Sequence, residues 1–122
     1  DLGHLNAHGT ATHINDKTES EALAALMGTD APEVPVVSVK GSVGHMLGGA
    51  GAVEALVTAY CVSEGVVPPT VGFAEPDPEC KVRVLTEALT DYPQKVALST
   101  SLGFGGHNGC LAFSPYVEDI QE

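Results

Sequence analysis

The chain has 122 residues, which is enough for one domain of ordinary size and few for two. It carries 16 acidic against 5 basic residues, a formal charge of −11, and so lacks the cations that bind nucleic-acid phosphates or anionic membrane surfaces. Hydrophobic residues make up 43%, no apolar stretch is as long as a membrane span requires, and the three cysteines are too widely spaced for a disulfide framework. We therefore expect one domain over 1–122, with no nucleic-acid partner, no membrane span and no metal site.

In chain order, the sequence predicts alternating strands and helices. Strands are expected at 2–6, 34–39, 81–86, 95–101 and 110–115, and helices at 19–27 and 50–63. The first helix is expected to begin near Asp16 or at a capping box of Thr18 and Glu21, and to end at Gly28. The order β-α-β-α-β-β-β predicts an α/β fold, a mixed β-sheet packed with helices, with two parallel crossover units and a closing antiparallel part. Because the chain opens directly into a strand without a starting Met, we expect it to be part of a longer protein.

Three glycine-rich loops, 7–13, 40–49 and 102–108, carry the polar residues that could act on a substrate. The first two follow strands, where open α/β sheets place their ligand sites. His8 lies in the first loop and His45 in the second. Two neutral imidazoles there could both donate an N–H to one oxygen and stabilise an oxyanion. They could instead bind a metal, or each could simply bond to the backbone of its own turn.

Glu54 stands in the expected helix AGAVEALVTAYCV, which is apolar on every side. Burial of an unpaired carboxylate is costly, so its pKa rises, a cation reaches it from elsewhere, or it reaches solvent near the helix N-terminus. Lys40, at the end of the preceding strand, is the obvious partner among 5 basic residues. We expect these two side chains to form a buried ion pair beside His8. We also expect the helix to leave apolar surface exposed in the isolated chain, because it needs cover on every side.

Taken together, the three loops resemble the β-ketoacyl-[acyl-carrier-protein] synthases of the elongating type. The matching blocks are NAHGTAT at 6–12, KGSVGHMLGGAGAVE at 40–54 and GFGGHNG at 103–109, in family-like order and spacing. The resemblance covers essentially the whole chain and is to the C-terminal half of the synthase. It implies a thiolase-like half-domain, with the family's nucleophilic Cys in the absent N-terminal half.

The chemistry that this resemblance implies is a decarboxylative Claisen condensation. A malonyl group on carrier protein loses carbon dioxide, and the resulting carbanion attacks an acyl thioester, in fatty acid or polyketide synthesis. His8 and His45 match the histidines that hold the malonyl thioester oxygen and stabilise the enolate. Lys40 and Glu54 match a lysine and glutamate that pair and fix His8 and the local electrostatics.

The other matched positions have supporting roles in the family. They are the acidic residues Asp16 and Glu19, the pantetheine contacts Thr10 and Thr12, and the oxyanion and gate residues Leu102, Gly103 and Phe104. Phe104 matches a gating phenylalanine whose backbone N–H helps to form the acyl oxyanion hole. Leu102 stands where elongating synthases usually have a second Phe, which bears on the preferred acyl-chain length.

The resemblance also implies an acyl carrier protein as partner, a cytoplasmic location, a homodimer in the full-length form, and no cofactor beyond the phosphopantetheine that the substrate carries. The net charge is a poor match for an acidic carrier protein, so the basic docking patch is expected in the missing half. No cysteine here has the setting of the nucleophile, and the chain alone is expected to be inactive. The alternative is a nucleophile-lacking module that determines chain length or only decarboxylates. A thiolase-type degradative enzyme is disfavoured by the paired histidines, and a metal hydrolase is weaker still.

Overall fold

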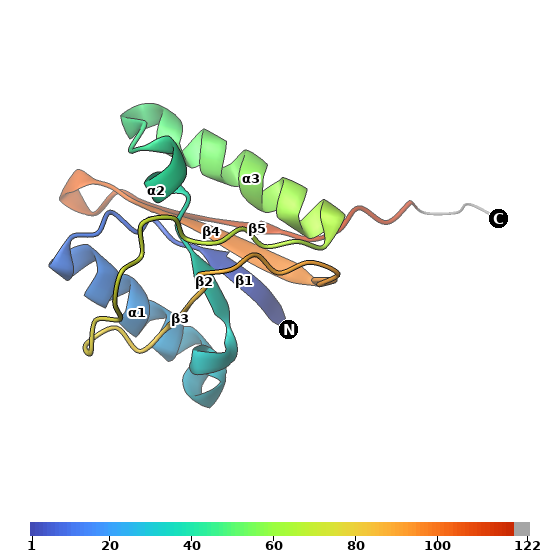
Figure 1. Ribbon diagram of the computed structural model, residues 1–122. Helices are drawn as coiled ribbons and strands as arrows, with labels where there is room; N and C mark the ends of the chain where they lie inside the picture. Colours follow the sequence, from blue (N-terminus) through green and yellow to red (C-terminus); the bar gives the residue numbers. More distant parts are fainter. Residues whose placement is uncertain (119–122) are drawn as a thin grey trace.

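The computed structural model describes residues 1–118 as a five-stranded sheet with α1 on one face and α3 on the other (Figure 1). The strands are β1 (Leu2–Asn6), β2 (Pro35–Val37), β3 (Arg83–Val84), β4 (Val96–Leu102) and β5 (Asn108–Phe113). The helices are α1 (His13–Met27), α2 (Lys40–Val43) and α3 (Ala50–Glu64), with 3-10 turns at Gly28–Glu33, Leu47–Gly49 and Phe104–Gly106. Residues 119–122 of the predicted domain lie outside the described part.

The sheet has the order β3-β2-β1-β4-β5, in which only the β4–β5 pair is antiparallel. The predicted mixed sheet, with parallel crossovers and an antiparallel closing strand, is therefore confirmed. The parallel strands β1 and β2 are almost wholly buried, as expected for strands covered on both faces. Beneath α1, Leu5, Leu23 and Val36 pack into one apolar cluster, and a second cluster joins Val37, Val67 and Leu85.

The first helix begins earlier than predicted, and the capping-box assignment is wrong. Thr12 is extended, with φ −93° and ψ 139°, and its carbonyl accepts the N–H of Asp16, so the helix starts at His13. The Thr18 hydroxyl donates to the carbonyl of Ile14, 2.7 Å away, which is the bond of a residue already inside a helix. The predicted end is confirmed, because Gly28 follows the last helical residue with a φ of 58°.

Smaller differences concern the segments that lie beside the site. Residues 40–43, expected as loop, form one helical turn, and the strand expected at 81–86 is reduced to Arg83–Val84. The predictions of β1, α3 and the two C-terminal strands are correct to within two residues.

The prediction that α3 leaves apolar surface exposed in this chain is confirmed. Its inward face carries Glu54, Thr58 and Cys61, all buried, whereas Leu56 and Tyr60 on its outward face are 73% and 63% exposed. No helix in residues 1–118 is long and apolar enough to cross a membrane.

His4, in the middle of β1, is completely buried and lies between the sheet and the end of α3. Its Nδ1 is 2.5 Å from Oε1 of Gln94, an oxygen that can only accept, so Nδ1 carries the proton. The Gln94 amide donates in turn to the carbonyls of Cys61 and Val66 at the C-terminal end of α3. Burial lowers the pKa of His4, and the hydrogen bond to Gln94 opposes this only in part.

We predict that His4 makes the protein less stable in mild acid. Because the pKa of His4 is lower in the folded state, the unfolded chain binds the proton more tightly. The contribution of neutral His4 to the free energy of unfolding is therefore fully present above the unfolded pKa of 6.5 and decreases as the pH falls below it. His4→Phe should remove this part of the pH dependence and cost about 1–3 kcal/mol at neutral pH, because it leaves Oε1 of Gln94 unpaired. Urea unfolding between pH 5 and 8 measures both effects. An exposed control, His107→Gln, should leave the pH profile as it was; a parental profile in His4→Phe would contradict the assignment.

Candidate active site

The three glycine-rich loops meet at one edge of the sheet. The first follows β1, the second follows β2 and the third follows β4. Because β1 lies between β2 and β4 and is parallel to both, the carboxyl ends of these strands point the same way. Figure 1 shows the three loops together at the end of the sheet near α2. The topology therefore places residues from distant parts of the sequence around one site.

His8 and His45 meet at this edge. Their ring centroids are 5.4 Å apart and the rings are almost perpendicular, at 88°. His8 is buried at the start of its loop, whereas the side chain of His45 is exposed. The predicted proximity of the two imidazoles is confirmed, whereas a common point faced by their nitrogens stays a prediction.

The hydrogen bonds of the two rings fix which nitrogen carries the proton in the neutral form. The backbone N–H of Leu47 donates to Nδ1 of His45 over 3.0 Å, and Nζ of Lys40 lies 3.3 Å from Nδ1 of His8. An ammonium group and an amide N–H can only donate, so each Nδ1 accepts. Each neutral ring therefore has its proton on Nε2 and can donate from that atom.

Lys40 and Glu54 form the predicted ion pair, and it is buried. Nζ of Lys40 is hydrogen bonded to Oε1 of Glu54, and the two side chains are only 7% and 2% exposed. The possibility that Glu54 reaches solvent is thereby excluded. Lys40 begins α2 and Glu54 lies in the second turn of α3, so the pair also ties these two helices together.

The environment of His8 favours the neutral imidazole. Burial lowers the pKa of His8, and the positive charge of Lys40 lowers it further. The carboxylates of Glu19 and Glu54 act in the opposite direction and reduce the effect without reversing it. A neutral ring that already accepts at Nδ1 can offer one N–H to a substrate oxygen.

Glu19 holds the loop that carries His8, and its carboxylate is saturated with hydrogen bonds. Oε1 accepts the backbone N–H of His8 and the hydroxyl of Thr100, both over 2.8 Å. Oε2 accepts the backbone N–H of Gly9 over 2.8 Å and the Asn15 amide over 2.9 Å. Glu19 thus joins α1, β4 and the histidine loop, which gives its predicted supporting position a physical basis.

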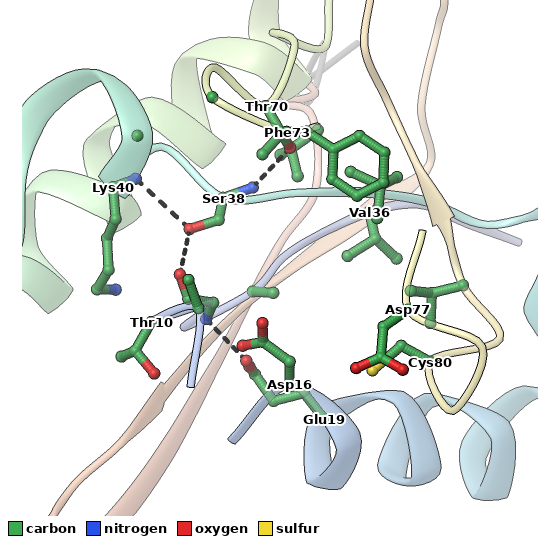
Figure 2. A pocket seen from close by; sticks show the side chains of 18 of the residues that line it. Thr10, Asp16, Glu19, Val36, Ser38, Lys40, Thr70, Phe73, Asp77 and Cys80 are labelled. Atoms are coloured by element: carbon green, nitrogen blue, oxygen red, sulfur yellow. Dashed lines mark hydrogen bonds between the residues drawn. The ribbon is translucent and has the colours of Figure 1, made fainter. Parts of the chain in front are cut away.

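A pocket of about 740 Å³ opens beside these residues. Figure 2 shows Thr10, Asp16 and Lys40 on one side and Phe73, Asp77 and Cys80, from the 66–80 segment, on the other. Thr10 lines the pocket, and its hydroxyl lies 3.0 Å from that of Thr12. Asp16, predicted as a supporting acidic residue, accepts a hydrogen bond from Asn15 at the start of α1. The pantetheine contact of the two threonines stays a prediction.

The predicted gate lies at the same edge of the sheet. Leu102 ends β4, Gly103 follows it, and Phe104 begins a 3-10 turn with its side chain fully exposed. The gating and oxyanion roles of these three residues stay predictions.

None of the three cysteines is paired with another. Burial raises the pKa of Cys61, and burial together with the carboxylates of Asp77, Asp16 and Glu79 raises the pKa of Cys80. Cys110 is exposed on β5. These two raised values oppose the activation that a nucleophilic thiol requires. In residues 1–118 no three His, Cys, Asp or Glu side chains are grouped as metal ligands would be.

Several polar residues that support the site were missed by the sequence reasoning. Asn6, at the end of β1, donates to the Thr58 hydroxyl and to the Glu54 carbonyl, over 3.2 and 3.4 Å. Ser38 and Thr100 bond to the histidine loop and to Glu19. The available signal was a polar residue inside or directly after a buried strand, where an unpaired polar group would be costly.

Comparisons with known proteins agree with this geometry. The family model described as β-ketoacyl synthase, C-terminal domain, matches residues 1–74. The 3-oxoacyl-[acyl-carrier-protein] synthase 2 of Synechocystis sp. is 44% identical over 115 residues, which cover 94% of this chain and 28% of that protein. The ishigamide ketosynthase/chain length factor has a TM-score of 0.88 at 35% identity, over 95% of this chain and 28% of that one.

A further solved structure is that of a type II polyketide acyl-carrier protein in complex with its ketosynthase bound to the hexaketide. It has a TM-score of 0.89 at 31% identity, over 94% of this chain and 28% of that one. The chain thus spans 28% of the length of these relatives and shares the thiolase-like fold of the ketosynthases. It belongs to the β-ketoacyl synthase family, as part of that family's C-terminal domain.

Proposed function

We propose that this chain supplies the decarboxylation half of a 3-oxoacyl-[acyl-carrier-protein] synthase. The synthase would condense a malonyl group on carrier protein with an acyl thioester, in fatty acid or polyketide synthesis. The observation that carries the proposal is the pair of imidazoles, 5.4 Å apart, each accepting at Nδ1 and therefore free to donate from Nε2.

In the proposed reaction the malonyl carboxylate leaves as carbon dioxide. The electron pair of the broken C–C bond moves into the thioester, whose oxygen becomes an enolate. His8 and His45 donate their Nε2 protons as hydrogen bonds to that oxygen, where the negative charge develops. The carbanion then attacks the acyl carbonyl, and the acyl–sulfur bond breaks with departure of the thiolate of a Cys that this chain does not supply.

The remaining residues keep His8 in the form that this step needs. The buried Lys40 donates to Nδ1 of His8 and adds a positive charge near the enolate, and Glu54 balances that charge. Glu19 holds the backbone of His8 and Gly9. Thr10, which lines the pocket, and Thr12, bonded to it, are suited to contact a phosphopantetheine arm. Phe104 is suited to gate the acyl side, and the reaction needs no separate cofactor.

The partner in this proposal is an acyl carrier protein, as in the ketosynthase complex found among the solved relatives. With a net charge of −11, this chain is a poor electrostatic match for an acidic partner, so docking would use basic residues elsewhere in the full-length protein. We place the synthase in the cytoplasm as a homodimer, as the family resemblance suggests. The uncovered apolar side of α3 is consistent with packing against more protein.

A module that determines chain length without condensing is the alternative. The two histidines and the buried ion pair disfavour a module that only determines chain length, because a module that performs no chemistry would not require a costly buried charge pair beside them. A module that only decarboxylates would use the same residues, and the presence of the nucleophilic Cys in the N-terminal half of the full-length protein distinguishes the synthase from it.

We predict that each histidine contributes separately to decarboxylation. In the complete synthase, His8→Ala and His45→Ala should each lower the rate of carbon dioxide release from malonyl-carrier protein by about 10²- to 10³-fold, the usual effect of removing one oxyanion donor. The exposed His13, whose ring is bonded to Glu79, provides the control His13→Ala. Parental rates in both His8→Ala and His45→Ala would refute the proposed reaction.

We predict that uncharged residues can replace the Lys40–Glu54 pair with little loss of folding stability but with loss of decarboxylation activity. Glu54→Gln should cost roughly 3–5 kcal/mol of unfolding free energy, because it leaves the buried Lys40 ammonium unpaired. Adding Lys40→Met should restore most of that stability without restoring decarboxylation. Chemical unfolding and carbon dioxide release are measured on the same preparations. A double variant that condensed at the parental rate would show that the pair is structural only.

A further inference from the structure

Ser38 bonds to three separate segments around the site. Its hydroxyl donates to the carbonyl of Gly9 over 3.1 Å and accepts the backbone N–H of Lys40 over 3.4 Å. Its backbone N–H donates to the hydroxyl of Thr70 over 3.2 Å. Figure 2 draws all three bonds. One small residue thus links the loop of His8, the first residue of α2 and the 66–80 segment.

Two glycines near Ser38, Gly9 and Gly41, lie so close to neighbouring segments that a side chain would not fit at either position. Gly9 has a φ of 47°, and a Cβ there would be 2.6 Å from Cβ of Ser38. A Cβ on Gly41 would collide with the carbonyl oxygen of Val71. The histidine loop therefore packs directly against the side chain of Ser38, and the 66–80 segment packs directly against α2 at Gly41.

Thr70, which holds the backbone of Ser38, is itself anchored to the sheet. Its N–H donates to the carbonyl of Leu85 over 2.8 Å, and the N–H of Leu85 donates to the carbonyl of Val36 over 3.1 Å. The backbone of Thr70 is therefore anchored, and its hydroxyl accepts the N–H of Ser38 from that position.

The groups that Ser38 links carry the central pair of the site. Gly9 directly follows His8, and Lys40 lies two residues beyond Ser38; the side chains of His8 and Lys40 meet at 3.3 Å. We propose that Ser38, held by Thr70, is a positioning residue that fixes the separation of the His8 imidazole and the Lys40 ammonium. The positioning role of the Ser38 hydroxyl is inferred from these distances alone, whereas its effect on catalysis rests on the function proposed above.

A hydroxyl is the group that this position needs. It gives its single proton to the Gly9 carbonyl and keeps lone pairs for the N–H of Lys40, one of the donors that a helix start leaves unpaired. Alanine can do neither, so Ser38→Ala removes both hydrogen bonds of the hydroxyl while it changes no side chain that the proposed reaction uses.

The experiment follows the His8 titration by NMR and the kinetics of condensation in the complete synthase. The charged and titratable groups facing His8 are Lys40 and His45, which lower its pKa, and Glu19 and Glu54, which raise it. In Ser38→Ala the ammonium is no longer held against Nδ1, so the pKa of His8 should rise. The kcat should fall about 10- to 100-fold, the usual effect of a small misplacement, with KM for the malonyl thioester unchanged.

Three further variants complete the test. Thr70→Val should shift both readouts in the same direction as Ser38→Ala, and Thr70→Ser, which keeps the hydroxyl, should behave as the parent. Ser42→Ala removes an exposed hydroxyl from the same short helix and should change neither readout.

The proposal is overturned if Ser38→Ala folds and keeps both the parental titration of His8 and the parental kcat, or if only its KM changes. If Ser38→Ala does not fold, Thr70→Val decides by the same two measurements. If the synthase itself proves inactive, the proposed function fails, whereas the titration still tests the positioning role on its own.

Discussion

The arrangement of the site depends on one ion pair that is sealed away from water. Lys40 and Glu54 are both buried, and each would be costly without the other. Their pairing fixes the start of α2 against the second turn of α3, and these two helices come from opposite ends of the glycine-rich segment that carries His45. A second N–H of the ammonium then donates to Nδ1 of His8. The buried ion pair thereby fixes the position of the Lys40 ammonium, and with it the hydrogen bond to His8.

Around this pair, the polar groups beneath the histidines are held by bonds between distant segments. Glu19 brings together α1, β4 and the loop after β1, and Asn6 connects β1 to α3. Three of these bonds, to the N–H groups of His8 and Gly9 and to the carbonyl of Glu54, are to backbone groups and therefore fix the path of the chain. Rigidity at this edge contrasts with the far side of α3, where Leu56 and Tyr60 stand in solvent. Order is concentrated where the proposed chemistry requires defined distances.

Much of this could be predicted from the sequence, and the exceptions have physical reasons. The periodicity of the apolar residues located β1, α3 and the mixed sheet, and an isolated Glu54 among apolar neighbours pointed to a cation as one of three explanations, with Lys40 as the obvious candidate. The start of α1 was misplaced because a plausible capping pair at Thr18 outweighed an extended Thr12, which carries no side-chain cap. Ser38 and Asn6 were missed because their roles come from contacts with residues 29 to 52 positions away, which local patterns do not reveal.

The protonation pattern of the two histidines affects how the proposed enolate would be used. A carbanion formed by loss of carbon dioxide can attack the acyl group, or it can take up a proton and end as an unproductive acetyl thioester. A charged imidazolium would be a competent proton source for that second path. Because burial and the charge of Lys40 lower the pKa of His8, the ring is neutral and can donate a hydrogen bond from its N–H without transferring the proton. The same contact that stabilises the charge would thus also favour carbon–carbon bond formation over wasteful turnover of malonyl groups.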